Sequence, residues 1–343
     1  MSQRTEIATL GEFGLIDRLT QPFQLKNASS LKGVGDDAAV IDAGDQKTLV
    51  TTDLLLEGIH FDLIYVPLKH LGYKAAVVNF SDIYAMNGTP KQITVSLGVS
   101  KRFAVEDLEE FYAGVKLACD HYGVDLVGGD TSASLTGLII SITCIGEGTE
   151  NTIVYRNSAN ENDLLCVTGD LGAAYMGLQL LEREKTVFTG QEDFQPDFSG
   201  KDYLLERQLK PEARKDIVET LKVKNIVPTS MIDISDGLSS EILHICTQSK
   251  KGCRIYEDRL PIDYQTAVMA EEFNMNLVTV ALNGGEDYEL LFTVPTALHD
   301  EVNAMEGIAI IGYIAKEDLG CCLITRDGQE FPIKAQGWNM SDN

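Results

Sequence analysis

The spacing of apolar residues predicts alternating helices and strands in the first half of the chain. Apolar positions recur at three- and four-residue steps over 105–122, and acidic residues gather in the first turn, where the helix dipole favours them. Similar spacing predicts helices over 68–86 and over 12–19. Short apolar or alternating runs predict strands over 38–41, 48–52, 93–99, 124–127 and 138–146.

The second half alternates in the same way. Composition changes at the polar, glycine-containing segment 146–151, so we predict a domain boundary between residues 1–150 and 151–343. Segment 185–200 has no period and is expected to be a loop. Helices are expected over 173–184, 214–221 and 236–246, and strands over 164–168, 278–282, 288–294, 308–314 and 322–325.

Composition narrows the function classes. The chain has 343 residues, of which 44% are hydrophobic, enough for more than one core. Its net charge of −24 weighs against unassisted binding to nucleic acids or anionic membranes, because both depend on Lys and Arg. We therefore expect neither nucleic acid nor a membrane as a partner.

The cysteines and the apolar runs bear on location. Seven cysteines occur without any CxxC spacing, so we expect reduced thiols. Cys321 and Cys322 are neighbours on an expected strand, and their side chains should point to opposite faces. No run has the length of a signal-peptide core at the N-terminus or approaches the roughly 20 apolar residues of a membrane span. These features predict a cytoplasmic protein.

Carboxylates recur beside glycines and hydroxyls. Clustered carboxylates repel one another unless a cation compensates them, and Mg²⁺, usually accompanied by nucleotide phosphates, prefers such oxygen ligands. The pattern therefore indicates magnesium-dependent phosphoryl chemistry. The segments are Gly35-Asp36-Asp37, Thr51-Thr52-Asp53, Ser81-Asp82, Gly128-Gly129-Asp130-Thr131 and Asp233-Ile234-Ser235-Asp236-Gly237.

Some of these acids also have ordinary structural explanations. Asp36 and Asp37 point apart on an extended segment, so one of them is expected at a metal, although a simple turn fits equally well. Asp53 ends a strand, where α/β folds place ligand groups. Asp82 lies on an otherwise apolar helix and should be paired or metal-bound if buried, but it could instead lie on a solvent-facing stripe.

The glycine-containing segments would let the backbone approach an anion closely. We expect a phosphate-cradling turn after the strand that ends at residue 127, with Asp130 on a metal, although the chain has no P-loop and no GxGxxG. Asp233 and Ser235 share one face of an extended segment. Asp236 has the position of a helix N-cap as well as that of a ligand.

Three further residues are candidates with equally simple alternatives. Glu286 follows two glycines and could receive a cationic group or belong to a hairpin turn. A lone histidine such as His60 is more often structural than catalytic. Trp338, the only tryptophan, could stack on an aromatic ligand or pack the C-terminal segment.

In order along the chain, these motifs resemble those of the thiamine-monophosphate kinases, within the superfamily of aminoimidazole ribonucleotide synthetase and selenophosphate synthetase. Each motif is weak alone, but the ordered set is specific, and the likeness runs from Gly11-Glu12-Phe13 to Gly337-Trp338. The set includes Gly35-Asp36-Asp37-Ala38-Ala39-Val40, Thr52-Asp53, Gly58-Ile59-His60-Phe61, Lys74-Ala75-Ala76-Val77-Val78-Asn79-Phe80-Ser81-Asp82-Ile83, Gly128-Gly129-Asp130-Thr131, Asp233-Ile234-Ser235-Asp236-Gly237-Leu238 and Gly284-Gly285-Glu286-Asp287-Tyr288-Glu289-Leu290.

The resemblance implies an α/β plus α+β architecture, the two-domain aminoimidazole-ribonucleotide-synthetase-like fold, with the N-terminal sheet pairing across a homodimer. It implies ATP-dependent phosphorylation of thiamine monophosphate to thiamine diphosphate with several Mg²⁺ ions. By motif, the metal ligands would be Asp37, Thr51, Thr52, Asp53, Asp82, Asp130, Asp233 and Asp236. ATP would contact Tyr112, Gly129, Asp130, Arg156 and Ser235, and the thiamine phosphate site would contain His60, Glu286 and Trp338.

The acceptor in such a reaction is an ionised phosphate, so it needs no strong general base, and direct in-line transfer without a phosphoenzyme is expected. Other members of the superfamily fit less well. A selenophosphate synthetase needs an early reactive cysteine, whereas the first cysteine is Cys119, and a hydrogenase-maturation dehydratase needs a C-terminal one, whereas the chain ends at Asn343. The motifs Gly11-Glu12-Phe13 and Gly284-Gly285-Glu286-Asp287-Tyr288-Glu289-Leu290 fit the thiamine-monophosphate kinases better than aminoimidazole ribonucleotide synthetase. A non-catalytic nucleotide- or cation-binding protein stays open.

Overall fold

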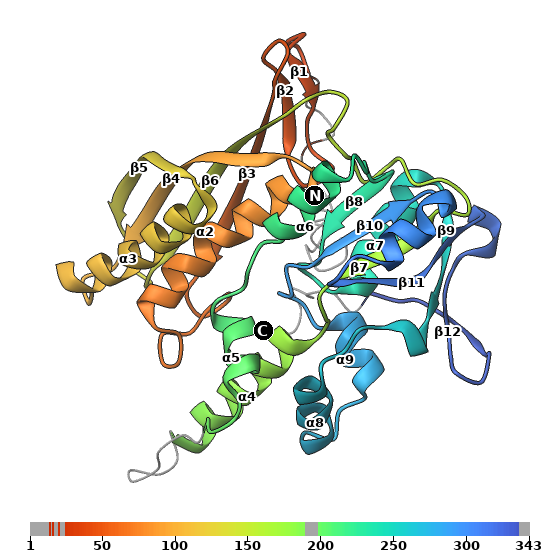
Figure 1. The fold of residues 1–343 in the computed structure, drawn as a ribbon. Coiled ribbons are helices and arrows are strands. Elements are labelled where there is room, and N and C mark those ends of the chain that lie inside the picture. The colour runs from red at the N-terminus through yellow and green to blue at the C-terminus, as the bar shows by residue number, and fades with distance from the viewer. Residues whose placement is uncertain (1–13, 15, 17–19, 21–24, 189–197, 336–343) are drawn as a thin grey trace, which may run out of the picture.

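The computed structural model describes residues 14, 16, 20, 25–188 and 198–335. These residues form two β-sheets with helices packed on them, one sheet from each half of the chain (Figure 1). No strand lies between residues 149 and 163, all of which are described. The division into domains at residue 150 stays a prediction.

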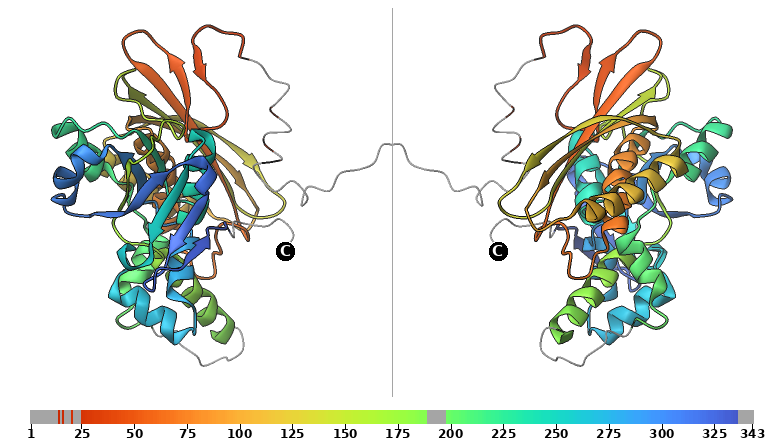
Figure 2. Two further views of the ribbon diagram at one scale, coloured as in Figure 1. Left: turned by 90° about the vertical axis from the view of Figure 1, so that its right-hand side faces the viewer. Right: turned by 90° about the vertical axis from the view of Figure 1, so that its left-hand side faces the viewer.

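The six-stranded sheet of the first half has the order β1-β2-β3-β6-β4-β5. All of its neighbours pair antiparallel except β4 and β5, which are parallel and place β5 at an open edge. The two views of Figure 2 show the β1–β2 hairpin projecting at one end of the molecule. The strands are β1 (Ser30–Lys32), β2 (Ala39–Asp42), β3 (Lys47–Leu56), β4 (Thr89–Val99), β5 (Asp125–Ala133) and β6 (Ile139–Gly148).

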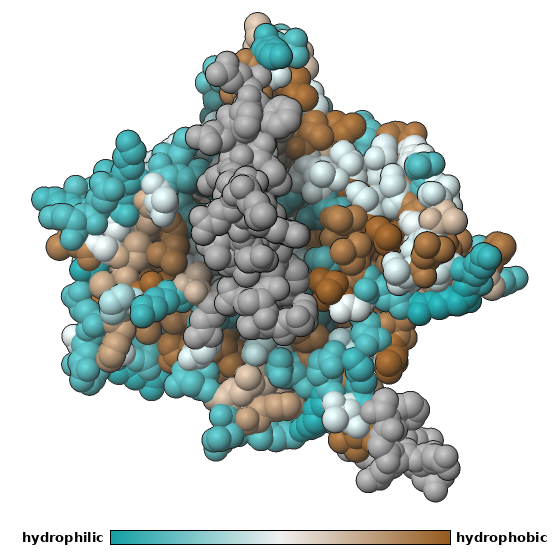
Figure 3. Space-filling model, turned by 180° about the vertical axis from the view of Figure 1, so that it is seen from behind, coloured by the Kyte–Doolittle hydropathy of each residue, from teal (hydrophilic) through white to brown (hydrophobic). Residues whose placement is uncertain are grey.

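One face of this sheet is turned away from the helices and carries exposed apolar side chains. Along β3 the side chains alternate, so Thr51 and Leu55 are buried while Thr52 and Leu54 are exposed. Viewed from behind, the molecule shows apolar patches between hydrophilic regions (Figure 3). Exposed apolar residues of the β1–β3 and β5 region are Leu31, Val34, Ile41, Leu54, Leu126 and Val127.

The seven-stranded sheet of the second half has the order β13-β12-β9-β11-β7-β10-β8. Its central strands β7 and β10 are fully buried, as expected for a sheet covered on both faces. The strands are β7 (Leu164–Thr168), β8 (Ser230–Asp233), β9 (Gly252–Tyr256), β10 (Leu290–Val294), β11 (Ile308–Ala315), β12 (Cys321–Ile324) and β13 (Glu330–Pro332).

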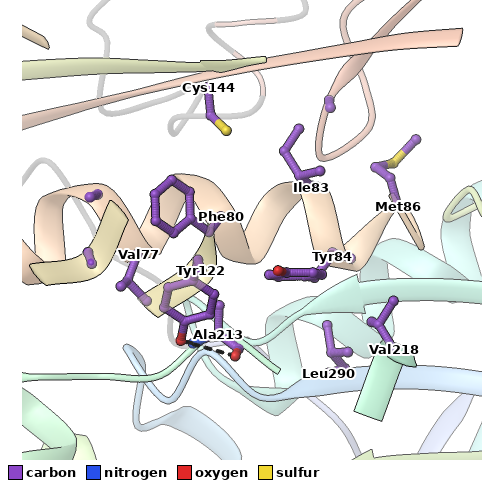
Figure 4. Close-up of a cluster of buried hydrophobic side chains, with 14 of the residues drawn as sticks. Val77, Phe80, Ile83, Tyr84, Met86, Tyr122, Cys144, Ala213, Val218 and Leu290 are labelled. Atoms are coloured by element: carbon purple, nitrogen blue, oxygen red, sulfur yellow. Dashed lines mark hydrogen bonds between the residues drawn. The ribbon is translucent and has the colours of Figure 1, made fainter. Parts of the chain in front are cut away.

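Helix α2 (Leu68–Ala85) joins the two halves. It is buried on almost every side, which explains why most of its residues are apolar or small. Figure 4 shows α2 with Cys144 of the first sheet on one side and Val218 and Leu290 of the second half on the other. One continuous hydrophobic cluster therefore spans both halves.

Close helix packing positions α2. It runs against α3 (Val105–Tyr122), and glycines at the crossing let the two backbones touch. A Cβ atom on Gly72 would lie 2.0 Å from the Phe111 carbonyl oxygen, and one on Gly114 would lie 1.9 Å from the Lys69 carbonyl oxygen. Any larger residue at either position would force the helices apart.

The other helices belong to the second half. Figures 1 and 2 place α4, α8 and α9 at the end of the molecule opposite the β1–β2 hairpin. The helices are α4 (Ala173–Phe188), α5 (Asp202–Leu209), α6 (Lys215–Val223), α7 (Leu238–Ser249), α8 (Tyr264–Glu272), α9 (Leu277–Asn283) and α10 (His299–Asn303). No helix among the described residues is long and apolar enough to cross a membrane.

Most of the expected long elements are present, and four expectations were wrong. The strand expected to end before Asp53 continues as β3 to Leu56, so Asp53 lies within the strand and not at its end. Segment 128–131 is not a turn but the middle of β5, because it continues to pair with β4. Segment 278–282 is not a strand but lies in α9, which the Asn276 side chain caps at its first turn. The α4 helix continues to Phe188, four residues into the expected loop. The helix expected over 12–19 lies almost wholly outside the described residues.

Candidate functional site

Three carboxylates from distant parts of the sequence converge where α2 meets both sheets. Asp37 lies just before β2, Asp82 on the last turn of α2, and Asp233 at the end of β8. One oxygen from each lies within 4.8 Å of the others. Oxygen ligands at this spacing suit a hard divalent cation such as Mg²⁺. We call these three residues the acidic cluster.

The acidic cluster is electrostatically strained. Burial, together with the charges of Asp53 and the other two carboxylates, raises the pKa of Asp82 well above its usual range. Burial and the charge of Asp37 raise the pKa of Asp233 to about 8. Burial raises the pKa of Asp53 to about 6. The protein therefore holds these groups together at an electrostatic cost that a bound cation would remove.

Local hydrogen bonds orient the carboxylates. The Ser81 hydroxyl donates to Asp233 at 2.6 Å, and the Thr51 hydroxyl donates to Asp82 at 2.5 Å. These two donors come from α2 and β3, so the cluster is braced by both elements that surround it. Hydroxyl donors fix geometry without adding the positive charge that the cluster lacks.

Among the described residues, Arg156 forms an ion pair with this site. Its guanidinium donates to Asp37 through Nε at 2.9 Å and through Nη2 at 2.5 Å, a two-bond pairing that also places it near Asp36. Burial and the charge of Asp37 raise the pKa of Asp36 to about 6. One guanidinium cannot balance this many carboxylates, and their oxygens are a donor set that fits Mg²⁺.

The cluster is reachable from solvent. Asp37 and Asp233 are buried, whereas Asp53 and Asp82 each keep a partly exposed surface. An ion could therefore approach from the side of β3 and α2 while the deeper carboxylates stay fixed.

The loop after β8 is built around a glycine. Gly237 has φ of 110°, which L side chains rarely adopt, and a Cβ there would lie 3.0 Å from the Asn283 backbone. Gly237 is the N-cap of α7, so Asp236 does not cap the helix. The backbone of Asp236 donates to Glu241, and burial raises the pKa of Asp236. The N-cap explanation for Asp236 therefore fails, and its side chain remains available.

A second loop meets the first one. The Glu286 backbone donates to the Ser235 carbonyl at 2.6 Å, which joins the two segments. Glu286 and Tyr288 have φ of 65° and 51°, values that are strained for these residue types and that occur often at functional sites. Buried Lys74 from α2 donates to the Glu286 carboxylate at 2.9 Å. Gln208 donates to the same oxygen at 2.8 Å.

His60 lies in the same neighbourhood. Its Nδ1 accepts a hydrogen bond from the Leu56 backbone at 3.0 Å, so the other ring nitrogen points elsewhere. Burial lowers the pKa of His60, and the charge of Glu286 opposes this shift. The structure thus brings His60 and Glu286 within electrostatic reach of each other, whereas Trp338 lies outside the described residues.

The residues expected to contact ATP divide between two places. Tyr112, Gly129 and Asp130 line a cavity of about 510 Å³ at the open edge of the first sheet. Arg156 and Ser235 lie at the acidic cluster and at the loop beside it. The structure does not bring these two groups of residues together around one cavity.

Asp130 is also apart from the acidic cluster. It is exposed on β5, three strands away from β3, at a spacing of about 4.8 Å per strand. The register pairs it with Ser96, whereas Asp53 belongs to the adjacent row with Ile142 and Val95, whose side chains point to the other face. Thr52 is likewise exposed on the outer face.

Several residues that shape this region were not predicted from the sequence as site residues. Lys74, Gln208 and Glu241 are buried polar side chains that hold the two loops. Burial raises the pKa of Tyr288, and the charges of Glu286 and the aspartates add to this shift. Lys74 carried a signal, because a lysine inside an otherwise apolar helix needs a partner. Gln208 lies on a helix that was not expected at all.

Comparisons with known proteins identify the class to which the fold belongs. Residues 35–147 match the family described as AIR synthase related protein, N-terminal domain. The region covers most of the first sheet, with Asp37, Asp53 and Asp82. The fold thus places the chain in the AIR-synthase-related class.

More specific relatives cover almost the whole chain. It is 39% identical over 286 residues to thiamine-monophosphate kinase of Aquifex aeolicus (strain VF5), covering 83% of this chain and 86% of that protein. It is 33% identical over 337 residues to that of Bacillus subtilis (strain 168), covering 96% and 99%. The solved structure of AaThiL complexed with AMPPCP and TMP matches with a TM-score of 0.83 and 33% identity, covering 99% of this chain and 100% of that chain. The chain belongs to the thiamine-monophosphate kinase family.

Proposed function

We propose that this chain is a kinase that transfers a phosphoryl group from ATP to thiamine monophosphate and produces thiamine diphosphate. The family relationship supports the substrate pair. The single observation in the structure that carries the proposal is the acidic cluster, in which buried carboxylates exceed the positive charge that the chain supplies.

The acidic cluster is proposed to hold magnesium through Asp37, Asp82 and Asp233, with Thr51, Asp53 and Asp236 beside them. Bound Mg²⁺ would supply charge neutralisation between two phosphate groups that otherwise repel. Ser81 and Thr51 keep Asp233 and Asp82 in place by hydrogen bonds of 2.6 Å and 2.5 Å. Fixed ligands of this kind need no reorganisation during the reaction.

The remaining residues are proposed to position the two substrates. Arg156, next to Asp37, offers a guanidinium to a nucleotide phosphate. Ser235 lies on the adjoining loop, where its carbonyl accepts from the Glu286 backbone. Glu286 faces the thiamine group, whose ring carries a positive charge, and His60 lies nearby. Lys74 and Gln208 hold the Glu286 carboxylate, which limits the orientations it can adopt.

The transfer is proposed to be direct and in line. The acceptor phosphate is ionised at neutral pH, so no side chain has to remove a proton from it. Direct transfer requires no nucleophilic side chain, and we expect no phosphoenzyme. Isolation of a phosphorylated residue during turnover would overturn this part of the proposal.

Two parts of the arrangement bear on assembly. The exposed apolar residues on the outer face of the first sheet, and the open edge at β5, support a proposal that this sheet pairs with that of a second copy. Pairing at β5 would bring a second molecule close to Asp130, Gly129 and Tyr112. We also propose that residues 1–150 and 151–343 form two domains. The protein is proposed to act in the cytoplasm.

The test is direct. Purified protein is incubated with ATP, Mg²⁺ and thiamine monophosphate, and thiamine diphosphate is measured by chromatography. We expect product only when all three are present, with one ADP released per product. ATP binding by folded protein without product would contradict the kinase proposal and favour a non-catalytic nucleotide-binding protein.

A further inference from the structure

A second group of convergent side chains, on other elements of the second sheet, is chemically unlike the acidic cluster. Cys246, Cys253 and Cys321 place their sulfur atoms within 4.8 Å of one another. None of them is in a disulfide. The proposed kinase reaction has no use for three thiols, so their convergence needs a separate explanation.

Three different elements supply the sulfurs. Cys253 on β9 and Cys321 on β12 are directly paired in a parallel register, so their side chains point to the same face of the sheet. Cys246 lies near the C-terminal end of α7, which packs against β9. Cys322, the next residue along β12, points to the opposite face and is paired with Arg254. The strand alternation thus selects one of the two neighbouring cysteines.

Ordinary packing is the simplest alternative, because free cysteine often behaves as a small apolar residue. Cys246 and Cys253 do belong to a hydrophobic cluster. However, Cys119, Cys144 and Cys166 are equally buried, and among the described residues they belong to no group of three possible metal ligands. Burial alone therefore does not bring thiols together in this protein.

The spacing and chemistry fit a soft cation. Zinc binds thiolates at about 2.3 Å, which places neighbouring sulfurs about 3.8 Å apart in a tetrahedral site. The three sulfurs already lie within 4.8 Å of one another, so a tetrahedral site needs at most a small contraction. Magnesium would not compete, since it prefers oxygen ligands. Cys321 is partly exposed, so solvent can provide a fourth ligand.

We propose that Cys246, Cys253 and Cys321 form a binding site for a soft divalent cation of the zinc class, separate from the acidic cluster. Binding converts thiols to thiolates and releases their protons to the solvent. The ion would fasten α7 to β9 and to β12, which is near the edge of the second sheet. Its role would be structural. An ion that fixes α7 would also steady the loop that contains Asp236, because α7 begins directly after this loop.

The test uses cadmium as a spectroscopic probe of thiolate binding. The full-length reduced protein, with excess Mg²⁺ present to occupy the acidic cluster, is titrated with Cd²⁺ while sulfur-to-metal charge-transfer absorption is recorded in the ultraviolet. We expect saturation at one ion per chain, displacement by Zn²⁺, and a rise of several degrees in the thermal midpoint.

Two variants on the same strand provide the comparison. Cys321→Ser should lose the absorption and the rise in thermal midpoint, whereas Cys322→Ser should retain both. Cys246→Ala gives a second test of the site if Cys321→Ser does not fold. No absorption in the wild type, or equal loss in the Cys322→Ser protein, would overturn the proposal and leave the cysteines as packing residues.

Discussion

Two groups of buried carboxylates in this molecule are neutralised in different ways. In the acidic cluster, Asp37 is paired with Arg156, while Asp82 and Asp233 receive only hydroxyl donors. In the second group, Glu289 accepts from Arg207 at 2.9 Å and from Arg214 at 2.6 Å. Asp37, Asp233 and Glu289 are all buried, so burial alone does not explain the difference.

The comparison shows what the fold can do when a carboxylate has a structural role. Glu289 also receives the Thr168 hydroxyl at 2.5 Å and is only 1% exposed. Arg207 lies on α5 and Arg214 directly precedes α6, so the two ion pairs connect both helices to the segment that contains Glu289. Among the residues that the structure describes, the acidic cluster has no such set of arginines, as expected for a site that receives its positive charge from outside.

The largest effect on stability is expected at Glu289, whose charge is neutralised by arginines of the chain itself. Glu289→Gln would leave two buried guanidinium groups without their shared partner, and we expect it to lower the free energy of unfolding by about 3–5 kcal/mol. Urea denaturation measures this. The control is Glu330→Gln, which removes an exposed partner of Arg254 and should cost about 1 kcal/mol or less. Equal losses for both variants would contradict the structural role of Glu289.

In the acidic cluster, by contrast, a substitution should lower turnover. Asp82→Asn removes a proposed metal ligand while keeping the shape of the side chain, and we expect kcat to fall about 10²- to 10³-fold. Steady-state formation of thiamine diphosphate gives the number. Asp120→Asn on the exposed surface of α3 is the matched control and should keep normal turnover. Near-normal turnover of the Asp82→Asn protein would remove this residue from the site.

The acidic cluster should also make the metal-free protein sensitive to pH. The pKa of Asp233 is raised from 3.8 to about 8, and that of Asp53 to about 6, so the folded protein holds protons that the unfolded chain has lost. In the presence of a chelator, stability should therefore be greatest below about pH 4 for these groups and decline by at least about 1 kcal/mol as the pH rises to 8. Urea midpoints across this range test the sign. If these midpoints rise across the range, the raised pKa values are wrong.

The smallest effect concerns substrate affinity. Glu286→Gln would weaken the proposed attraction to the cationic ring of thiamine monophosphate and would also leave buried Lys74 without its ionised partner. We expect KM for this substrate to rise about tenfold, with little change in KM for ATP. Initial-rate measurements with each substrate varied in turn separate the two. An equal change for ATP would show that Glu286 acts through the fold of its loop.

Local patterns predicted the elements with strong periodicity. The helix expected over 68–86 is α2 (Leu68–Ala85), because its apolar run is long and uninterrupted. The five-residue apolar run at 278–282 was assigned as a strand, since short runs of this kind do not distinguish the two structures. The Asn276 N-cap would have favoured the helix that the structure contains.

The acidic residues of the site could be selected from the sequence, but their partners could not. Repeated carboxylates beside glycines pointed to Asp37, Asp82 and Asp233. The pairing of Arg156 with Asp37 spans 119 residues, and that of Lys74 with Glu286 spans 212. Such contacts depend on how α2 is enclosed between the two halves, which no local pattern records.

The most direct test of the central claim, that the acidic cluster is built to receive a divalent cation, is the thermal midpoint of the wild type and of Asp233→Asn at pH 8, each with and without Mg²⁺. Removing one charge should raise the midpoint of the metal-free protein, even though the site is damaged. Mg²⁺ should raise the midpoint of the wild type much more than that of the variant. A wild type that does not respond to Mg²⁺, or a variant that is less stable than the wild type without metal, would contradict the account.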